Sequence, residues 1–188
     1  MTVKVEKVVQ AYKGWSTLSK VTLSDGDTRF EREVEDHGQA VGVLPYDAER
    51  RVALLIQTPR TPVLLAGRVE PLLEAPAGLI DEGEATEESV RREAHEEVGV
   101  ELTKLEPIGT IWSCPGVSTE TIALFLAPYT LASRTGQGGG LADENESITV
   151  IEESLATLAR LADEGGLADM KTFLLVQTLR LRKPDLFR

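Results

Sequence analysis

Three glutamates on one predicted helix face have the clearest chemical potential in this sequence. Glu93, Glu96 and Glu97 stand at positions i, i+3 and i+4 within residues 86–98, which we expect to form a helix. This spacing puts three carboxylates on one face, where like charges repel by about 0.2–0.5 kcal/mol per exposed pair. A divalent cation would convert that cost into a binding site, because Mg²⁺ prefers oxygen ligands and also takes substrate phosphate oxygens. A solvated acidic helix face explains the same three residues, so their surroundings must decide.

A fixed spacing of other residues surrounds these glutamates. Five residues separate Gly78 from Glu84, seven separate Glu84 from Arg92, and Gly99 follows the last acidic pair. The pattern G-x5-E-x7-R-E-U-x-E-E-x-G-U, in which U is apolar or small, resembles the Nudix box at every specified position. The resemblance implies that Glu84 and Arg92 form a structural ion pair. It also implies that the two glycines serve backbone geometry.

The same resemblance implies a metal-dependent hydrolase acting on a nucleoside diphosphate linked to another group. It assigns metal binding to Glu93, Glu96 and Glu97 and to the backbone carbonyl of Ala77, with Glu93 and Glu97 acting directly in catalysis. Mg²⁺ is the expected cofactor, and Mn²⁺ is an alternative. Such metals neutralise phosphate charge and activate water.

Two segments downstream of the box resemble ADP-ribose pyrophosphatases. Residues 112–120 match the S-P-G-x-(S/T)-x-E stretch of that group, with a cysteine before the proline, and residues 140–148 match its G-L-A-(D/E)-E-N-E-D-I loop. In those enzymes this loop supplies the catalytic base. The resemblance therefore implies that Glu144 is the base, and that Glu146 and Glu120 bind substrate. Without the resemblance, these would be read as solvated loop acids.

Residues 1–36 are expected to form a small N-terminal β-subdomain, and residues 37–188 the Nudix hydrolase domain. Hairpins with few core residues are marginal by themselves, so we expect this subdomain to pack on the main body or on a second subunit. Members of the ADP-ribose group are homodimers that swap such a subdomain, and the resemblance implies the same dimer here. Trp15 and Phe30 resemble the aromatics that sandwich adenine in the family; ordinary packing is the alternative.

Arg60 is the candidate for binding the diphosphate. It ends Gln-Thr-Pro-Arg, which resembles the Q-x-x-R of the family. The guanidinium fork suits phosphate oxygens, although a surface cation would explain the residue equally well.

Alternating polar and apolar runs, turn residues and caps predict the elements that position these groups. We expect strands at 3–9, 17–23, 28–34, 40–46, 51–57, 72–76, 105–112, 121–127 and 148–151, and helices at 86–98, 154–162 and 167–181. Thr86 is expected to cap the first helix, and the proline-containing segment 58–71 to be a loop. Strands mixed with a few helices predict an α/β fold. The resemblance specifies a Nudix α/β/α sandwich with a mixed central sheet and a small N-terminal antiparallel β-subdomain.

Composition excludes several other classes of protein. The 188 residues carry a net charge of −11, which disfavours nucleic acid and anionic membranes as partners. One cysteine and two histidines provide neither an intrachain disulfide nor an ordinary structural zinc site. No apolar run has the length of a secretory signal or a membrane span, so a cytoplasmic location is expected.

The sequence leaves the substrate open between two nucleotide sugars. Hydrolysis of ADP-ribose to AMP and ribose 5-phosphate is the first hypothesis, and GDP-mannose is the second. Residues 169–172 resemble the GDP-mannose pyrophosphatases as much as the ADP-ribose group, and stacking aromatics accept either base. A catalytically silent Nudix ligand sensor is the alternative of another class. Sensors of this kind usually lose a box carboxylate, whereas this chain keeps all of them.

Overall fold

The computed structural model describes residues 2–141 and 147–188. The chain divides into two compact units. The first consists of Met1–Ala40 and Thr110–Ile122, and the second of Val41–Gly109 and Ala123–Arg188.

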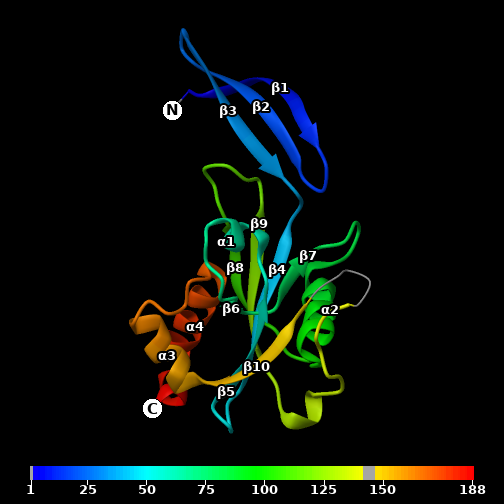
Figure 1. Ribbon diagram of the computed structural model, residues 1–188, viewed down its shortest axis with the longest axis vertical. Coiled ribbons are helices and arrows are strands. Elements are labelled where there is room, and N and C mark those ends of the chain that lie inside the picture. The colour runs from blue at the N-terminus through cyan, green and yellow to red at the C-terminus, as the bar shows by residue number, and fades with distance from the viewer. Residues whose placement is uncertain (1, 142–146) are drawn as a thin grey trace. The chain divides into compact units, whose positions relative to one another are not determined.

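The first unit contains a three-stranded antiparallel sheet in the order β1-β2-β3 (Figure 1). Its strands are β1 (Lys4–Lys13), β2 (Thr17–Asp25) and β3 (Thr28–Asp36). Asp25 pairs with Thr28 across a two-residue turn, in which Gly26 has a φ of +59° that favours glycine. All ten residues of β1 are exposed, so this strand contributes little to a core.

The second sheet of the protein is mixed and has seven strands. Five strands follow the order β10-β5-β4-β9-β8, while β6 pairs with β5 and β7 pairs with β4. The strands are β4 (Ala40–Asp47), β5 (Val52–Thr58), β6 (Leu72–Glu74), β7 (Ala77–Leu79), β8 (Glu106–Trp112), β9 (Thr121–Pro128) and β10 (Thr149–Ser154). Every residue of β4 is buried, as expected for a central strand covered on both faces.

Helices cover both faces of this sheet (Figure 1). Helix α2 (Thr86–Val98) lies on one side, and α3 (Leu155–Asp163) and α4 (Met170–Arg182) lie on the other. The core under α2 contains Val90, Ala94 and Val98 from the helix, packed with side chains of β4, β5 and β9. The two C-terminal helices bury Leu155, Leu158, Leu175 and Leu179 completely. This layering confirms the predicted α/β/α sandwich with its small antiparallel sheet.

Local details differ from the sequence-based expectations at several places. Ala77–Leu79 forms β7, a strand that the sequence did not predict. Residues Thr61–Leu65 form a short helix, α1, inside the expected loop, because Pro62 lies in the first turn, where a missing N–H costs nothing. Thr86 is the first residue of α2 and not its cap; the N-cap is Ala85, with extended backbone and no side-chain hydrogen bond. Helix α4 begins at Met170 and not at residue 167, since Asp169 accepts a hydrogen bond from the Thr172 N–H. Two short 3-10 helices, η1 (Leu131–Ser133) and η3 (Pro184–Phe187), complete the structure.

Among the described helices, none is long and apolar enough to cross a membrane.

Candidate active site

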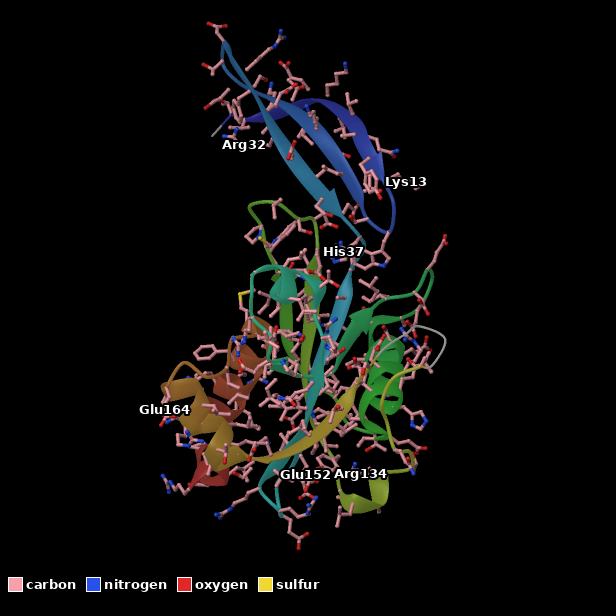
Figure 2. The ribbon with its side chains drawn as sticks, in the orientation of Figure 1. Lys13, Arg32, His37, Arg134, Glu152 and Glu164 are labelled. Carbon is pink, nitrogen blue, oxygen red and sulfur yellow. The ribbon has the colours of Figure 1, made fainter. Side chains whose placement is uncertain are left out.

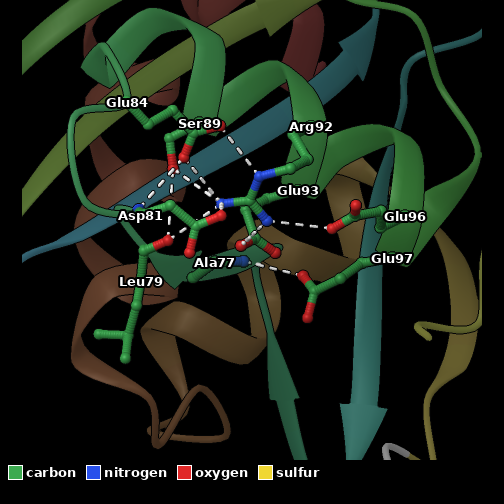
Figure 3. A network of polar contacts seen from close by, with 9 residues as sticks. All are labelled: Ala77, Leu79, Asp81, Glu84, Ser89, Arg92, Glu93, Glu96 and Glu97. Carbon is green, nitrogen blue, oxygen red and sulfur yellow. Dashed lines mark hydrogen bonds and ion pairs between the residues drawn. The ribbon is translucent and has the colours of Figure 1, made fainter. Parts of the chain in front are cut away.

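The acidic helix is connected directly to a short strand of the central sheet (Figure 3). Strand β7 leads through residues 80–85 into α2, whose first turn carries Glu87 and Glu88, where the helix dipole favours negative charge. Gly99 ends the helix with a φ of +69°, as the sequence predicts. The strand–loop–helix order therefore places the end of β7 beside the acidic face of α2.

Arg92 holds the loop against the helix (Figure 3). Its Nε and Nη2 donate to the two carboxylate oxygens of Glu84, both at 3.0 Å, and Nη2 also donates to the Leu79 carbonyl at 3.1 Å. The hydrogen bond from Arg92 lowers the pKa of Glu84 to about 2. The ion pair therefore fixes both ends of the loop that separates β7 from α2.

The same guanidinium also reaches the acidic helix face. Arg92 Nη1 donates to Glu93 Oε1 at 2.7 Å and to Glu96 Oε2 at 3.1 Å. Glu97 is only 3% exposed and accepts a hydrogen bond from the Ala77 N–H at 2.8 Å. Arg92 thus offsets repulsion between the two more exposed carboxylates, while Glu97 bridges the helix and β7.

Gly78 leaves room for one of these carboxylates. A Cβ at this position would overlap the carboxylate group of Glu93. The first box glycine therefore leaves the space that the Glu93 carboxylate occupies, and its own φ is not in the left-handed region.

The chemistry of this face suits a hard divalent cation. Its donors are carboxylate oxygens beside the backbone of β7, and Mg²⁺ and Mn²⁺ take such oxygen ligands. In the part of the chain that the structure describes, no three acidic, histidine or cysteine side chains already converge on one point. Glu93 and Glu96 instead each contact the Arg92 guanidinium, so a positive charge already lies at this face.

Arg60 lies in a second charged cluster, which the sequence did not predict. Its Nε and Nη2 donate to the two oxygens of Glu74 at 2.9 and 3.2 Å. Glu74 is 3% exposed and also accepts from Lys171 Nζ, which lies 3.2 Å from Asp169. Burial alone would raise the pKa of Glu74, but hydrogen bonds and charge from Arg60 and Lys171 lower it. A lone glutamate ending an apolar segment was the sequence signal for this cluster.

The candidate base-binding residues lie in the first unit. Trp15 follows β1 and is 79% exposed. Phe30 lies on β3 and is partly buried, with the Arg32 guanidinium carbon 4.9 Å from its ring centroid. The carboxylate of Glu120 lies 3.2 Å from Nε2 of His37, a histidine to which sequence reasoning gave no role. His37 is labelled in Figure 2.

The predicted base Glu144 and its neighbour Glu146 lie outside the described residues. The glycine-rich segment before them is attached to the C-terminal end of α2. Gly139 N donates to the Glu97 carbonyl at 2.9 Å, and Gly140 N donates to the Glu96 carbonyl at 3.0 Å. These bonds satisfy carbonyl groups that a helix end otherwise leaves unpaired.

Comparison with known proteins identifies the class to which this fold and acidic helix belong. The NUDIX domain family matches residues 36–174, which is most of the chain. The chain therefore belongs to the Nudix family.

Curated relatives and a solved structure agree with this assignment. A GDP-mannose pyrophosphatase of Cronobacter sakazakii is 38% identical over 164 residues, covering 86% of this chain and 84% of the relative. A GDP-mannose pyrophosphatase of Escherichia coli O1:K1 is 34% identical over 163 residues, covering 86% and 84%. A crystal structure described as an ADP compounds hydrolase superposes with a TM-score of 0.73 at 20% identity, covering 97% of each chain. The likeness to this structure shows the fold alone.

Proposed function

We propose that this protein is a Mg²⁺-dependent pyrophosphatase that hydrolyses the diphosphate of a nucleoside diphosphate sugar. The observation that carries the proposal is the complete Nudix box in a chain 38% identical to a GDP-mannose pyrophosphatase over 86% of its length. Retention of every box carboxylate favours an enzyme over a silent ligand sensor. The substrate is GDP-mannose or ADP-ribose: the relatives favour the first, and the resemblance of residues 112–120 and 140–148 to ADP-ribose pyrophosphatases favours the second.

The acidic helix face is the proposed metal site. Glu93, Glu96, Glu97 and the Ala77 carbonyl would hold Mg²⁺, or Mn²⁺ in its place. When bound, the metal neutralises phosphate charge and activates water. The closeness of Ala77 to Glu97, whose carboxylate accepts the Ala77 N–H, supports the inclusion of this backbone position.

Proton transfer is assigned to a residue outside the helix. Water that attacks phosphorus must lose a proton, and a nearby carboxylate can take it. We assign this role to Glu144. The attachment of Gly139 and Gly140 to the end of α2 supports it, because the segment preceding Glu144 starts at the acidic helix.

The substrate-binding residues are assigned from the family pattern. We place the nucleobase on Trp15 and Phe30, and the remaining polar contacts on Arg60, Glu120 and Glu146. The exposure of the Trp15 ring supports a stacking role. The contact of Arg60 with Glu74 is compatible with diphosphate binding, since one Glu74 carboxylate is shared between Arg60 and Lys171.

We also propose a homodimer in which residues 1–36 form a subdomain that packs on the 37–188 domain of the partner subunit. Strand β1 supports this, because Val5, Val8 and Tyr12 are each at least 60% exposed. Apolar side chains this exposed on an isolated sheet are typical of an association surface. Sedimentation equilibrium of the whole chain distinguishes a dimer from a monomer.

Release of phosphate monoesters across a panel of nucleotide sugars tests the activity. Cleavage of the diphosphate yields two monoesters, and an added phosphatase then liberates inorganic phosphate from them but not from the intact substrate. The Glu97→Gln variant, prepared identically, controls for contaminating hydrolases. Turnover of GDP-mannose or ADP-ribose with Mg²⁺ is expected, and the comparison of the two ranks them. Binding of a nucleotide sugar without turnover would instead identify a ligand sensor.

A further inference from the structure

Two aromatic rings of the first unit are stacked on one another. The indole of Trp15 and the imidazole of His37 have centroids 4.9 Å apart and planes 22° apart. Trp15 lies in the tight turn between β1 and β2, in which Gly14 N donates to the Ser16 carbonyl at 2.9 Å. Since Trp15 is 79% exposed, its ring is supported on the His37 side and open elsewhere.

His37 is held by two carboxylates from different segments. Its Nδ1 lies 2.7 Å from Glu35 Oε1, at the end of β3, and its Nε2 lies 3.2 Å from Glu120 Oε1, just before β9. Glu35 also accepts from the Ser118 hydroxyl at 2.8 Å. With a carboxylate at each ring nitrogen, the imidazole side chain is only 16% exposed and fixed at both ends.

This arrangement favours a charged imidazole. Burial alone would lower the pKa of His37, but its hydrogen bonds to Glu35 and Glu120 and their charges raise it. Among the residues that the structure describes, the titratable groups that interact with the ring are these two carboxylates; the adjacent Asp36 instead accepts from the Gly38 N–H at 3.3 Å. A cation stacked on indole is attracted by the ring quadrupole, most strongly for tryptophan.

We infer that His37 is a positioning residue: it stacks on one face of the Trp15 indole and holds the ring in place. The opposite face of the indole then forms a platform for the purine base of the substrate. The inference rests on the proposed function, because the ligand is the nucleobase of that same substrate. His37 does not touch the ligand; it acts through Trp15. Glu35 and Glu120 orient His37, and their hydrogen bonds and charges raise its pKa.

The sign of the pH dependence follows from the raised pKa. The charged stack is complete while His37 is protonated. It is lost as the pH rises through the His37 pKa, which lies above its ordinary value of 6.5. Nucleotide binding should therefore weaken across this interval.

Tryptophan fluorescence reports on the stacking of His37 against Trp15 independently of turnover. The chain has two tryptophans and two histidines, so Trp112→Phe leaves Trp15 as the single emitter. A protonated imidazole in contact with indole quenches its emission, and we expect emission to rise with pH through a single transition. His37→Gln should abolish this transition, whereas the matched histidine control His95→Gln should keep it. A transition that survives His37→Gln, or is absent in the parent, overturns the inference.

Binding of GDP-mannose and ADP-ribose by calorimetry in metal-free buffer tests the platform. Trp15→Ala should weaken the preferred nucleotide about fivefold to a hundredfold, as expected for loss of base stacking. His37→Gln should weaken it about twofold to fivefold, with kcat unchanged in the turnover assay. An unchanged dissociation constant in either variant, or no binding by the parent, overturns the inference. Failure of the proposed function is a separate result, namely binding with intact Trp15 dependence but no hydrolysis.

Discussion

Substitution by alanine at two glycines of the candidate active site should affect stability to very different extents. We consider Gly78→Ala and Gly138→Ala. At Gly78 an added Cβ meets the end of the Glu93 side chain, which can rotate away. At Gly138 it meets the Glu97 carbonyl and lies 2.7 Å from the Val98 Cα, and neither backbone atom can move without distorting α2.

The expected magnitudes follow from these contacts. Moving Glu93 off its preferred rotamer costs about 0.5–1.5 kcal/mol, so Gly78→Ala should be only mildly destabilising. Gly138 has a φ of +69°, where a side chain costs about 1–2 kcal/mol. The clash also threatens the hydrogen bonds from Gly139 and Gly140 to α2, each contributing about 0.5–1.5 kcal/mol. Gly138→Ala should therefore lower the free energy of unfolding by about 2–5 kcal/mol.

The loss of activity in Gly78→Ala should be much larger than its small loss of stability suggests. Displacing the Glu93 carboxylate, a proposed metal ligand, by about 1 Å can cost a hundredfold in rate, so Gly78→Ala should be folded but nearly inactive. Urea denaturation gives the free energy of unfolding, and nucleotide-sugar turnover at varied Mg²⁺ gives the second readout. Gly26→Ala is the matched control, since Gly26 has a φ of +59° and open space for a Cβ. The reasoning is refuted if Gly138→Ala is no more destabilising than this control, or if Gly78→Ala retains full activity.

Three further predictions concern acidic residues. Glu97→Gln should reduce turnover and Mg²⁺ affinity by about tenfold to a hundredfold. The fold should remain, because an amide oxygen still accepts the Ala77 N–H. Kinetics at varied Mg²⁺ measure both effects, and unchanged kinetics would contradict the metal assignment. Glu144→Gln should lower kcat by about a hundredfold to ten-thousandfold with little change in substrate affinity, and an unchanged kcat would exclude it as the base. The Glu84 pKa of about 2 lies below its ordinary 4.5, so the contribution of its ion pair is present above pH 4.5 and is lost as the pH falls toward 2. Unfolding measured across this pH range should show a component that Arg92→Gln removes, and identical pH profiles would contradict it.

The box geometry could be predicted from sequence because its contacts are local. Glu84 and Arg92 are eight residues apart and meet across one loop and two helical turns. The i, i+3 and i+4 spacing likewise fixes which side chains share a face once the helix forms. Alternation and turn residues likewise identify most strands before their partners are known, whereas the α/β/α layering was implied by the resemblance.

Contacts between distant segments could not be predicted in this way. Glu74 and Lys171 are separated by 97 positions, and their pairing depends on α4 packing near β6. His37 depends equally on Glu120, which a loop returns to the end of β3. No spacing rule relates such residues, so Arg60 was assigned to a ligand while its buried partner went unnoticed. The prediction that Thr86 caps α2 is wrong for a local reason. Ala85 has the extended backbone conformation of an N-cap, so the helix begins at Thr86, one residue earlier than a capping threonine requires.

Arg92 links the structural and chemical parts of the box. The resemblance assigns it only to an ion pair with Glu84, yet its Nη1 also donates to Glu93 and Glu96. An acidic face that is to bind a divalent cation carries a repulsive cost, and a guanidinium at its edge offsets part of it. The two oxygens of Glu84 hold Arg92 through Nε and Nη2, so in the proposed metal complex a cation would replace Nη1 at Glu93 and Glu96 while the loop stays attached. If the acidic face binds a metal as proposed, Arg92 would compete with that metal for Glu93 and Glu96, in addition to holding the loop on the helix.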